Sequence, residues 1–148
     1  MIVSVTEEML PEILAIERDA FPVPWSEGSF HSETEVPDAC FEAYTEAGRV
    51  LGYCVLHRAG VEGELYKIAV MKDARRRGIG ETLMASAEEC ARRWRLTRIF
   101  LEVRAGNAPA IRLYEKRGFT RVGIRKRYYT DPTEDAAVMV KELEESGC

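Results

Sequence analysis

Three arginines and two glycines form a loop whose residue types suit a phosphate group. The apolar run Ile68-Ala69-Val70 is typical of a strand, and the loop Arg75-Arg76-Arg77-Gly78-Ile79-Gly80 follows it and leads into a helical pattern. A helix N-terminus offers unpaired N–H groups and the positive end of a dipole, and glycines leave an anion room to approach. A glycine pair after a strand is also common in tight turns, so the arginines strengthen a pattern that is weak alone. The loop matches neither a P-loop nor a G-x-G-x-x-G fingerprint, which indicates a different phosphate carrier.

Two polar side chains lie within apolar segments and could take part in proton transfer. Glu102 belongs to the strand-like run Phe100-Leu101-Glu102-Val103, where a carboxylate suits a general base. The alternative is an ion pair with Arg104 or Arg125, which these residues alone favour. Tyr114 lies in a helical pattern, where a half-buried aromatic ring with its hydroxyl at the surface is the simpler interpretation.

Charge is divided unevenly along the chain. The 148 residues carry 21 Lys and Arg against 25 Asp and Glu, a net charge of −4. Residues 1–50 hold eleven acids and two bases (net −9), whereas residues 51–148 hold fourteen acids and nineteen bases (net +5). Separate acidic and basic segments favour two different ligands, and the acidic one suits a positively charged peptide.

Composition excludes several classes of protein. A chain of this length buries roughly two-thirds of its unfolded surface, so one domain over residues 1–148 needs no metal or disulfide for stability. Four cysteines and two histidines lack the spacing of a zinc site or of a Cys/His enzyme (Cys40, Cys54, Cys90, Cys148, His31, His57). No signal-like or membrane-spanning apolar run is present, which predicts a cytoplasmic protein without a membrane partner. The arginine triplet could bind nucleic acid, but the pI near 5.4 argues against it.

Local periodicity predicts seven strands and four helices. The strands are expected at residues 2–5, 40–45, 50–57, 65–71, 99–103, 120–129 and 136–141. Helices are expected at residues 6–19, 80–94 and 109–116, with a short one starting at Ser26. Thr6 and Ser26 are candidate N-caps. This order predicts an α/β sandwich.

Several segments together resemble the GNAT-superfamily N-acetyltransferases. The similarity covers nearly the whole chain and is carried by the arginine–glycine loop, Leu101–Asn107 and Leu113–Phe119. Further matches bring it close to the RimI type, the ribosomal-protein-alanine N-acetyltransferases: Pro24-Trp25-Ser26, Glu102-Val103-Arg104, Tyr128-Tyr129 and Glu134-Asp135-Ala136. The resemblance implies a GNAT fold, in which a mixed, mostly antiparallel central sheet of about seven strands is flanked by helices.

The resemblance also implies acetyl-CoA as the donor, with no metal. The pyrophosphate of acetyl-CoA would lie on the N–H groups of Arg76–Glu81. Its pantetheine arm would run alongside the strand Ile68-Ala69-Val70, and Asn107 would hold the arm from the other side. The implied cofactor-binding residues are Ile68, Ala69, Val70, Arg75, Arg76, Arg77, Gly78, Ile79, Gly80, Glu81 and Asn107.

Roles for the two proton-transfer candidates follow from the same resemblance. Glu102 would be the base, and a peptide α-amine, which titrates at about 7.7–8.0, needs little deprotonation near neutral pH. The Tyr114 hydroxyl would protonate the departing thiolate. A strand irregularity near Val70 would leave a backbone N–H to polarise the acetyl carbonyl.

The implied acceptor is the N-terminal alanine of a basic small-subunit ribosomal protein, acetylated directly in a ternary complex. Trp25, Tyr128 and Tyr129 match the acceptor region, although Trp25 could equally be a core anchor between two helices. The loop before Glu134-Asp135 is shorter than in some members and lacks a preceding G-R, which weakens the prediction of the acceptor. Alternatives are acetylation of a lysine or a small amine, and a non-catalytic acyl-CoA-binding module.

Overall fold

Seven strands form one sheet in the order β1-β2-β3-β4-β5-β7-β6. The computed structural model describes residues 1–37 and 39–143. The strands are β1 (Ile2–Ser4), β2 (Ala39–Glu46), β3 (Arg49–Ala59), β4 (Glu62–Val70), β5 (Arg98–Arg104), β6 (Thr120–Tyr129) and β7 (Glu134–Glu142). All neighbours are antiparallel except β4 and β5, which are parallel. The predicted mixed, mostly antiparallel sheet is therefore confirmed.

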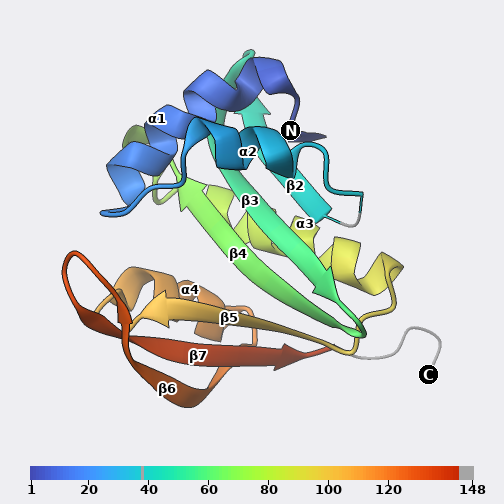
Figure 1. The fold of residues 1–148 in the computed structure, drawn as a ribbon. Coiled ribbons are helices and arrows are strands. Elements are labelled where there is room, and N and C mark those ends of the chain that lie inside the picture. The colour runs from blue at the N-terminus through green and yellow to red at the C-terminus, as the bar shows by residue number, and fades with distance from the viewer. Residues whose placement is uncertain (38, 144–148) are drawn as a thin grey trace.

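Helices cover both faces of the sheet (Figure 1). On one face lie α1 (Leu10–Ala20) and α2 (Glu27–Glu33), and on the other lie α3 (Ile79–Arg93) and α4 (Ala108–Lys116). Short 3-10 turns precede α1 (Glu7–Met9) and α3 (Lys72–Ala74). Each face has its own apolar core, one beneath α1 and α2 and the other beneath α3 and α4. Within the described residues, no helix is both long enough and apolar enough to span a membrane.

The two predicted helix caps have different outcomes. Ser26 caps α2 as expected, because its Oγ accepts a hydrogen bond from the Ser29 N–H at 3.1 Å. Thr6 makes no side-chain cap, and the chain first forms a 3-10 turn there. Pro11 lies in the first turn of α1 and has no N–H to donate to the carbonyl four residues earlier. The α-helix therefore begins at Leu10 and not at the predicted residue 6.

Strands β4 and β5 pair at one end only. Their parallel register runs from Glu62 opposite Arg98 to Leu65 opposite Leu101, and Figure 1 shows the two strands diverging beyond it. A bulge marks the start of the divergence, since β3 pairs with Leu65 and then with Lys67 and leaves Tyr66 as the extra residue. The irregularity expected near Val70 therefore lies at Tyr66 instead.

Candidate active site

The gap between β4 and β5 opens into a cavity of about 1080 Å³. Most of the residues selected from the sequence line it: Trp25, Ile68, Ala69, Val70, Arg75, Arg76, Gly78, Ile79, Gly80, Glu102, Asn107, Tyr114, Tyr128 and Tyr129. Arg77 and Glu81 are the two that do not. Residues from both faces of the sheet and from both sides of the split thus meet at one place.

The start of α3 carries a row of free backbone N–H groups, and four of the residues in this row line the cavity. No described residue accepts a hydrogen bond from the N–H groups of Arg76 to Glu81, and the first helical bond runs from the Thr82 N–H to the Gly78 carbonyl at 3.0 Å. Arg76 and Gly78 have φ angles of 66° and 79°, which turn the loop back on itself. Such a row of N–H groups at a helix N-terminus suits a phosphate group.

The three arginines of the loop have different partners. The Arg75 Nε donates to the Val70 carbonyl at 3.1 Å, which ties the loop to the end of β4. Arg77 bonds Glu46 at 2.5 Å, so its guanidinium is directed to the β2–β3 turn and only its backbone belongs to the row of N–H groups. Glu81 likewise directs its carboxylate to Lys116, at 3.1 Å.

Gly80 serves a purpose that its sequence position did not indicate. A Cβ added there would meet the Leu113 side chain at 3.3 Å, so the missing side chain allows α3 to pack closely on α4. At Gly78 the added Cβ would meet nothing within 4 Å, and the positive φ is what favours glycine. The two glycines therefore have different structural roles, close helix packing at Gly80 and a left-handed turn at Gly78.

The free edge of β4 carries N–H groups that point into the split. The Met71 N–H donates to the Leu51 carbonyl of β3 at 2.8 Å. Alternation along an antiparallel strand then turns the N–H groups of Val70 and Ile68 away from β3, toward the side where pairing with β5 has ended. A ligand along this edge can accept hydrogen bonds from them.

Glu102 projects from β5 on the α1–α2 face of the sheet. Its side chain is 11% exposed, and its Oε2 accepts no hydrogen bond from any described residue. The Arg125 Nε lies 3.3 Å from that oxygen without the geometry of a hydrogen bond. Burial, followed by the Glu102 charge, raises the pKa of Glu64. A buried acceptor oxygen without a donor suits a base or an anchor for an incoming amine.

Tyr114 reaches the cavity from α4. Its ring is buried and packs on Phe119, with ring centroids 5.9 Å apart. Burial raises the pKa of Tyr114 above its usual range, so the hydroxyl keeps its proton at neutral and moderately alkaline pH. Asn107 begins the same helix, where its side chain accepts a hydrogen bond from the Ala110 N–H at 3.3 Å. Its side chain is therefore engaged as a helix cap.

Aromatic side chains form one wall of the cavity. Trp25 packs on Phe30 at 5.2 Å between ring centroids and also lines the cavity. Tyr128 and Tyr129 meet edge to face at 5.0 Å. Burial, with the Glu102 carboxylate second, raises the pKa of Tyr129 to about 12. Both phenols thus remain neutral beside the carboxylate.

Glu17 and Lys67 are charged residues of this region that were not selected from the sequence. Glu17 of α1 is fully buried, and Lys67 of β4 lies 2.8 Å from its carboxylate and lines the cavity. An acidic residue in an amphipathic helix is usually exposed, so helical periodicity did not identify Glu17. Lys67 follows the bulge residue, and no local pattern indicated which way it points.

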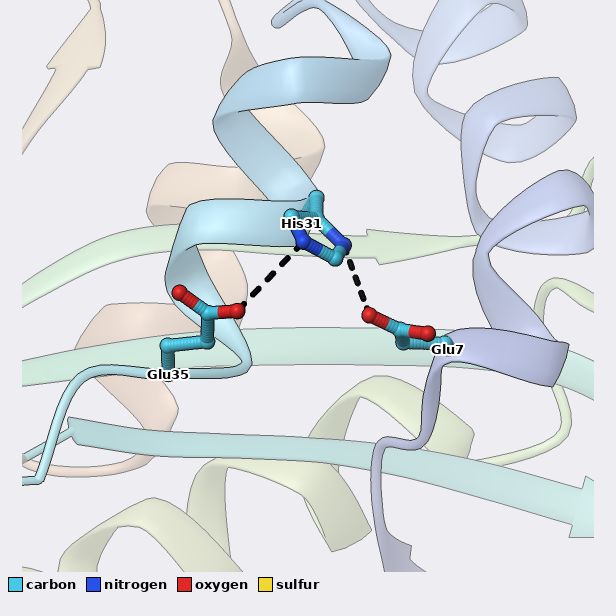
Figure 2. A group of neighbouring side chains, drawn as sticks. All are labelled: Glu7, His31 and Glu35. Atoms are coloured by element: carbon cyan, nitrogen blue, oxygen red, sulfur yellow. Dashed lines mark ion pairs between the residues drawn. The ribbon is translucent and has the colours of Figure 1, made fainter.

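Both histidines make ion pairs outside the cavity. His31 of α2 bridges Glu7 at 2.8 Å and Glu35 at 3.4 Å, as Figure 2 shows, and all three side chains are exposed. His57 of β3 bonds Glu33 at 2.7 Å. Each ring nitrogen of His31 faces a carboxylate, which ties the turn before α1 to α2.

Comparison with known proteins assigns this arrangement to a family. The model of the Acetyltransferase (GNAT) family matches residues 10–119. The chain belongs to the GNAT acetyltransferases. A Bacillus subtilis (strain 168) relative is 38% identical over 133 residues, which cover 89% of this chain and 88% of the relative. The [Ribosomal protein bS18]-alanine N-acetyltransferase of Escherichia coli (strain K12) is 36% identical over 132 residues, 88% of each chain.

Two solved structures agree with this sequence similarity. The crystal structure of the ribosomal-protein-S18-alanine N-acetyltransferase from Escherichia coli superposes with a TM-score of 0.89 at 34% identity and covers 99% of this chain and 96% of that one. Ard1 from Thermoplasma volcanium has a TM-score of 0.88 at 27% identity, with 98% of both chains covered. This GNAT chain therefore shares its full architecture with N-acetyltransferases.

Proposed function

We propose that this GNAT protein transfers the acetyl group of acetyl-CoA to the N-terminal alanine of ribosomal protein bS18. The observation that carries the proposal is a single cavity with a row of N–H groups at one end and the Glu102 carboxylate at the other. The acceptor follows from similarity to the bS18-alanine acetyltransferase of Escherichia coli, which spans 88% of both chains. A ribosomal acceptor implies a cytoplasmic reaction.

The donor fits the phosphate end of the cavity. Six consecutive N–H groups from Arg76 to Glu81 suit the pyrophosphate of acetyl-CoA, and the positive end of the α3 dipole adds to the attraction. The pantetheine arm would lie along the free edge of β4, whose Val70 N–H would polarise the acetyl carbonyl. The α4 residues on the other side of the split enclose the arm.

The chemistry is a direct transfer between two bound substrates. The α-amine nitrogen forms a bond to the acetyl carbon while the C–S bond breaks, and the acetylated peptide and free CoA result. Glu102 accepts the proton that the amine loses, directly or through a water, and Tyr114 donates its proton to the CoA thiolate. Both residues return to their starting state by exchange with solvent.

The acceptor would enter from the α1–α2 face. Trp25, Tyr128 and Tyr129 line this side of the cavity, and Glu102 projects from the same face. The N-terminal region that supplies the α1–α2 wall is the acidic part of the chain, with a net charge of −9 over residues 1–50. A basic N-terminal peptide is the acceptor that this charge attracts.

Two basic peptides test the proposal. One has a free N-terminal alanine, and the other has a blocked N-terminus and several lysines. Each is incubated with protein and acetyl-CoA, and the added mass is located by fragmentation. Acetylation of the free alanine alone is expected. Lysine acetylation would reassign the enzyme to another GNAT activity, and no reaction with either peptide would favour a small amine or a non-catalytic CoA-binding protein.

A further inference from the structure

A buried ion pair supports the wall of the acceptor side. The fully buried Glu17 carboxylate accepts hydrogen bonds from the Tyr53 hydroxyl, from the Trp25 backbone N–H at 2.8 Å and from the Lys67 ammonium at 2.8 Å. These donors come from β3, the α1–α2 loop and β4. Withdrawal of Lys67 would leave a buried charge without its counterion, which is strongly unfavourable. The lysine is therefore held in place.

Stability alone does not account for this pair. Buried ion pairs can often be replaced by apolar side chains without loss of stability, so a pair at the wall of a cavity indicates another use. The Lys67 Nζ also lies 4.0 Å from the ring centroid of Phe21 and 5.1 Å from that of Trp25. An ammonium has three N–H donors, and Glu17 takes one. The side chain lines the cavity, so further donors are available to a ligand there.

Lys67 and Glu102 face the same compartment from opposite edges of the split. Lys67 bonds to α1, so it projects on the α1–α2 face. Glu102 alternates with Leu101 and Val103, which pack in the core beneath α3 and α4, so it projects on the α1–α2 face as well. A molecule whose amine approaches Glu102 on β5 therefore lies in the compartment that Lys67 of β4 borders.

We propose that Lys67, held by Glu17, donates a hydrogen bond to the carbonyl oxygen of the acceptor's first residue. This assignment rests on the proposed function. A peptide N-terminus has a carbonyl carbon bonded to the carbon that bears the amine, whereas a lysine side chain or a polyamine has a methylene group there. A buried donor rejects analogues that lack its acceptor. Lys67 is thus a specificity-determining residue that selects N-terminal α-amines. The negative charge of Glu17 offsets the repulsion between the Lys67 ammonium and an acceptor amine that arrives protonated.

The test compares two acceptors on wild type and two variants. One acceptor is a basic peptide with N-terminal alanine, and the other is identical except that an (E)-alkene replaces the first peptide bond and removes its carbonyl. The variants are Lys67→Met and the double variant Glu17→Gln with Lys67→Met, which leaves no unbalanced buried charge. Steady-state kcat/KM is measured for each combination of enzyme and peptide. The two peptides differ in the basicity of their amines, but this difference cancels when a variant is compared with wild type on the same peptide.

Both variants are expected to lower kcat/KM for the natural peptide by about 10- to 100-fold, the range for a hydrogen bond with a charged donor. For the alkene peptide both variants should change kcat/KM by less than about twofold, because this peptide has no carbonyl for Lys67 of the wild type to bind. An equal loss on both peptides, or no loss on either, overturns the assignment of Lys67. A wild type that acetylates neither peptide overturns the proposed function and the assignment together.

Controls separate a local loss from a general one. Lys72→Met removes an exposed lysine two residues beyond β4 and should leave kcat/KM unchanged for both peptides. Acetyl-CoA affinity, measured by calorimetry, should be the same in all variants because Lys67 lies on the acceptor side. A double variant that folds, binds acetyl-CoA and keeps the wild-type preference for the natural peptide contradicts the proposal.

Discussion

At the scale of residues, Glu102 makes one of the two ion pairs that its sequence position allowed. Arg125 approaches its Oε2 at 3.3 Å, so the ion pair is with Arg125. Arg104 instead donates to the carbonyls of Thr130 and Pro132, each at 2.8 Å. The Arg125 side chain is 59% exposed, and solvent weakens such a pair. Arg125 thus lies close to the Glu102 carboxylate, but it leaves Oε2 free to accept a hydrogen bond from another group.

Substitution of each proton-transfer residue tests its role. Glu102→Gln keeps the size of the side chain but removes the base, and Tyr114→Phe removes only the hydroxyl. Each is expected to lower kcat by about 10²- to 10⁴-fold at neutral pH, the usual contribution of a positioned acid or base. The measurement is thiol release with saturating peptide and acetyl-CoA.

The pH profile adds a check on Tyr114. Because burial raises its pKa, the wild-type rate should show no loss from tyrosine ionisation near pH 10, where an ordinary tyrosine would lose its proton. Acetyl-CoA affinity should be unchanged in both variants. Full turnover in either variant, with acetyl-CoA still bound, would show that its side chain is not part of the chemistry.

At the scale of elements, periodicity and caps predicted most of the fold because they are local. The helix over residues 80–94 and the strand over 120–129 lie within one residue of their observed bounds. The early end of the β4–β5 pairing was not predicted, since it depends on the bulge at Tyr66 and on packing across the sheet. The Glu17 network was missed for a similar reason: its partners Tyr53 and Lys67 are 36 and 50 residues away.

The turn that begins α3 provides a prediction with a matched control. Gly78→Ala places a Cβ on a backbone with φ of 79°, and Gly60→Ala does the same at 64° in the β3–β4 turn. Neither Cβ would meet another atom within 4 Å, so both variants should lose stability through backbone strain alone, about 1–2 kcal/mol. Only Gly78→Ala should weaken acetyl-CoA binding, because only that turn aims the row of N–H groups. Chemical denaturation and calorimetry measure the two effects, and equal acetyl-CoA affinities would contradict this role of the turn.

At the scale of the whole molecule, the two proposed substrates would approach parts of the chain whose net charges are opposite. The arginine loop that precedes α3 borders the phosphate end of the cavity, whereas the helices of the acceptor side come from the acidic part of the chain. Charges of this kind act over about 10 Å at 0.1 M salt and accelerate the encounter of complementary partners. They also disfavour an acidic acceptor.

Salt should therefore affect acceptors according to their charge. With acetyl-CoA saturating, raising the salt from about 0.02 to 0.5 M should lower kcat/KM for a basic alanine peptide several-fold, because the Debye length falls below 10 Å. The kcat should stay constant, since the bound amine and Glu102 are already in contact. A peptide that begins with the same residues but has a neutral remainder should show little change. Equal salt dependence for the two peptides would mean that the acidic region of residues 1–50 plays no part in attracting the acceptor, and that recognition is confined to the cavity.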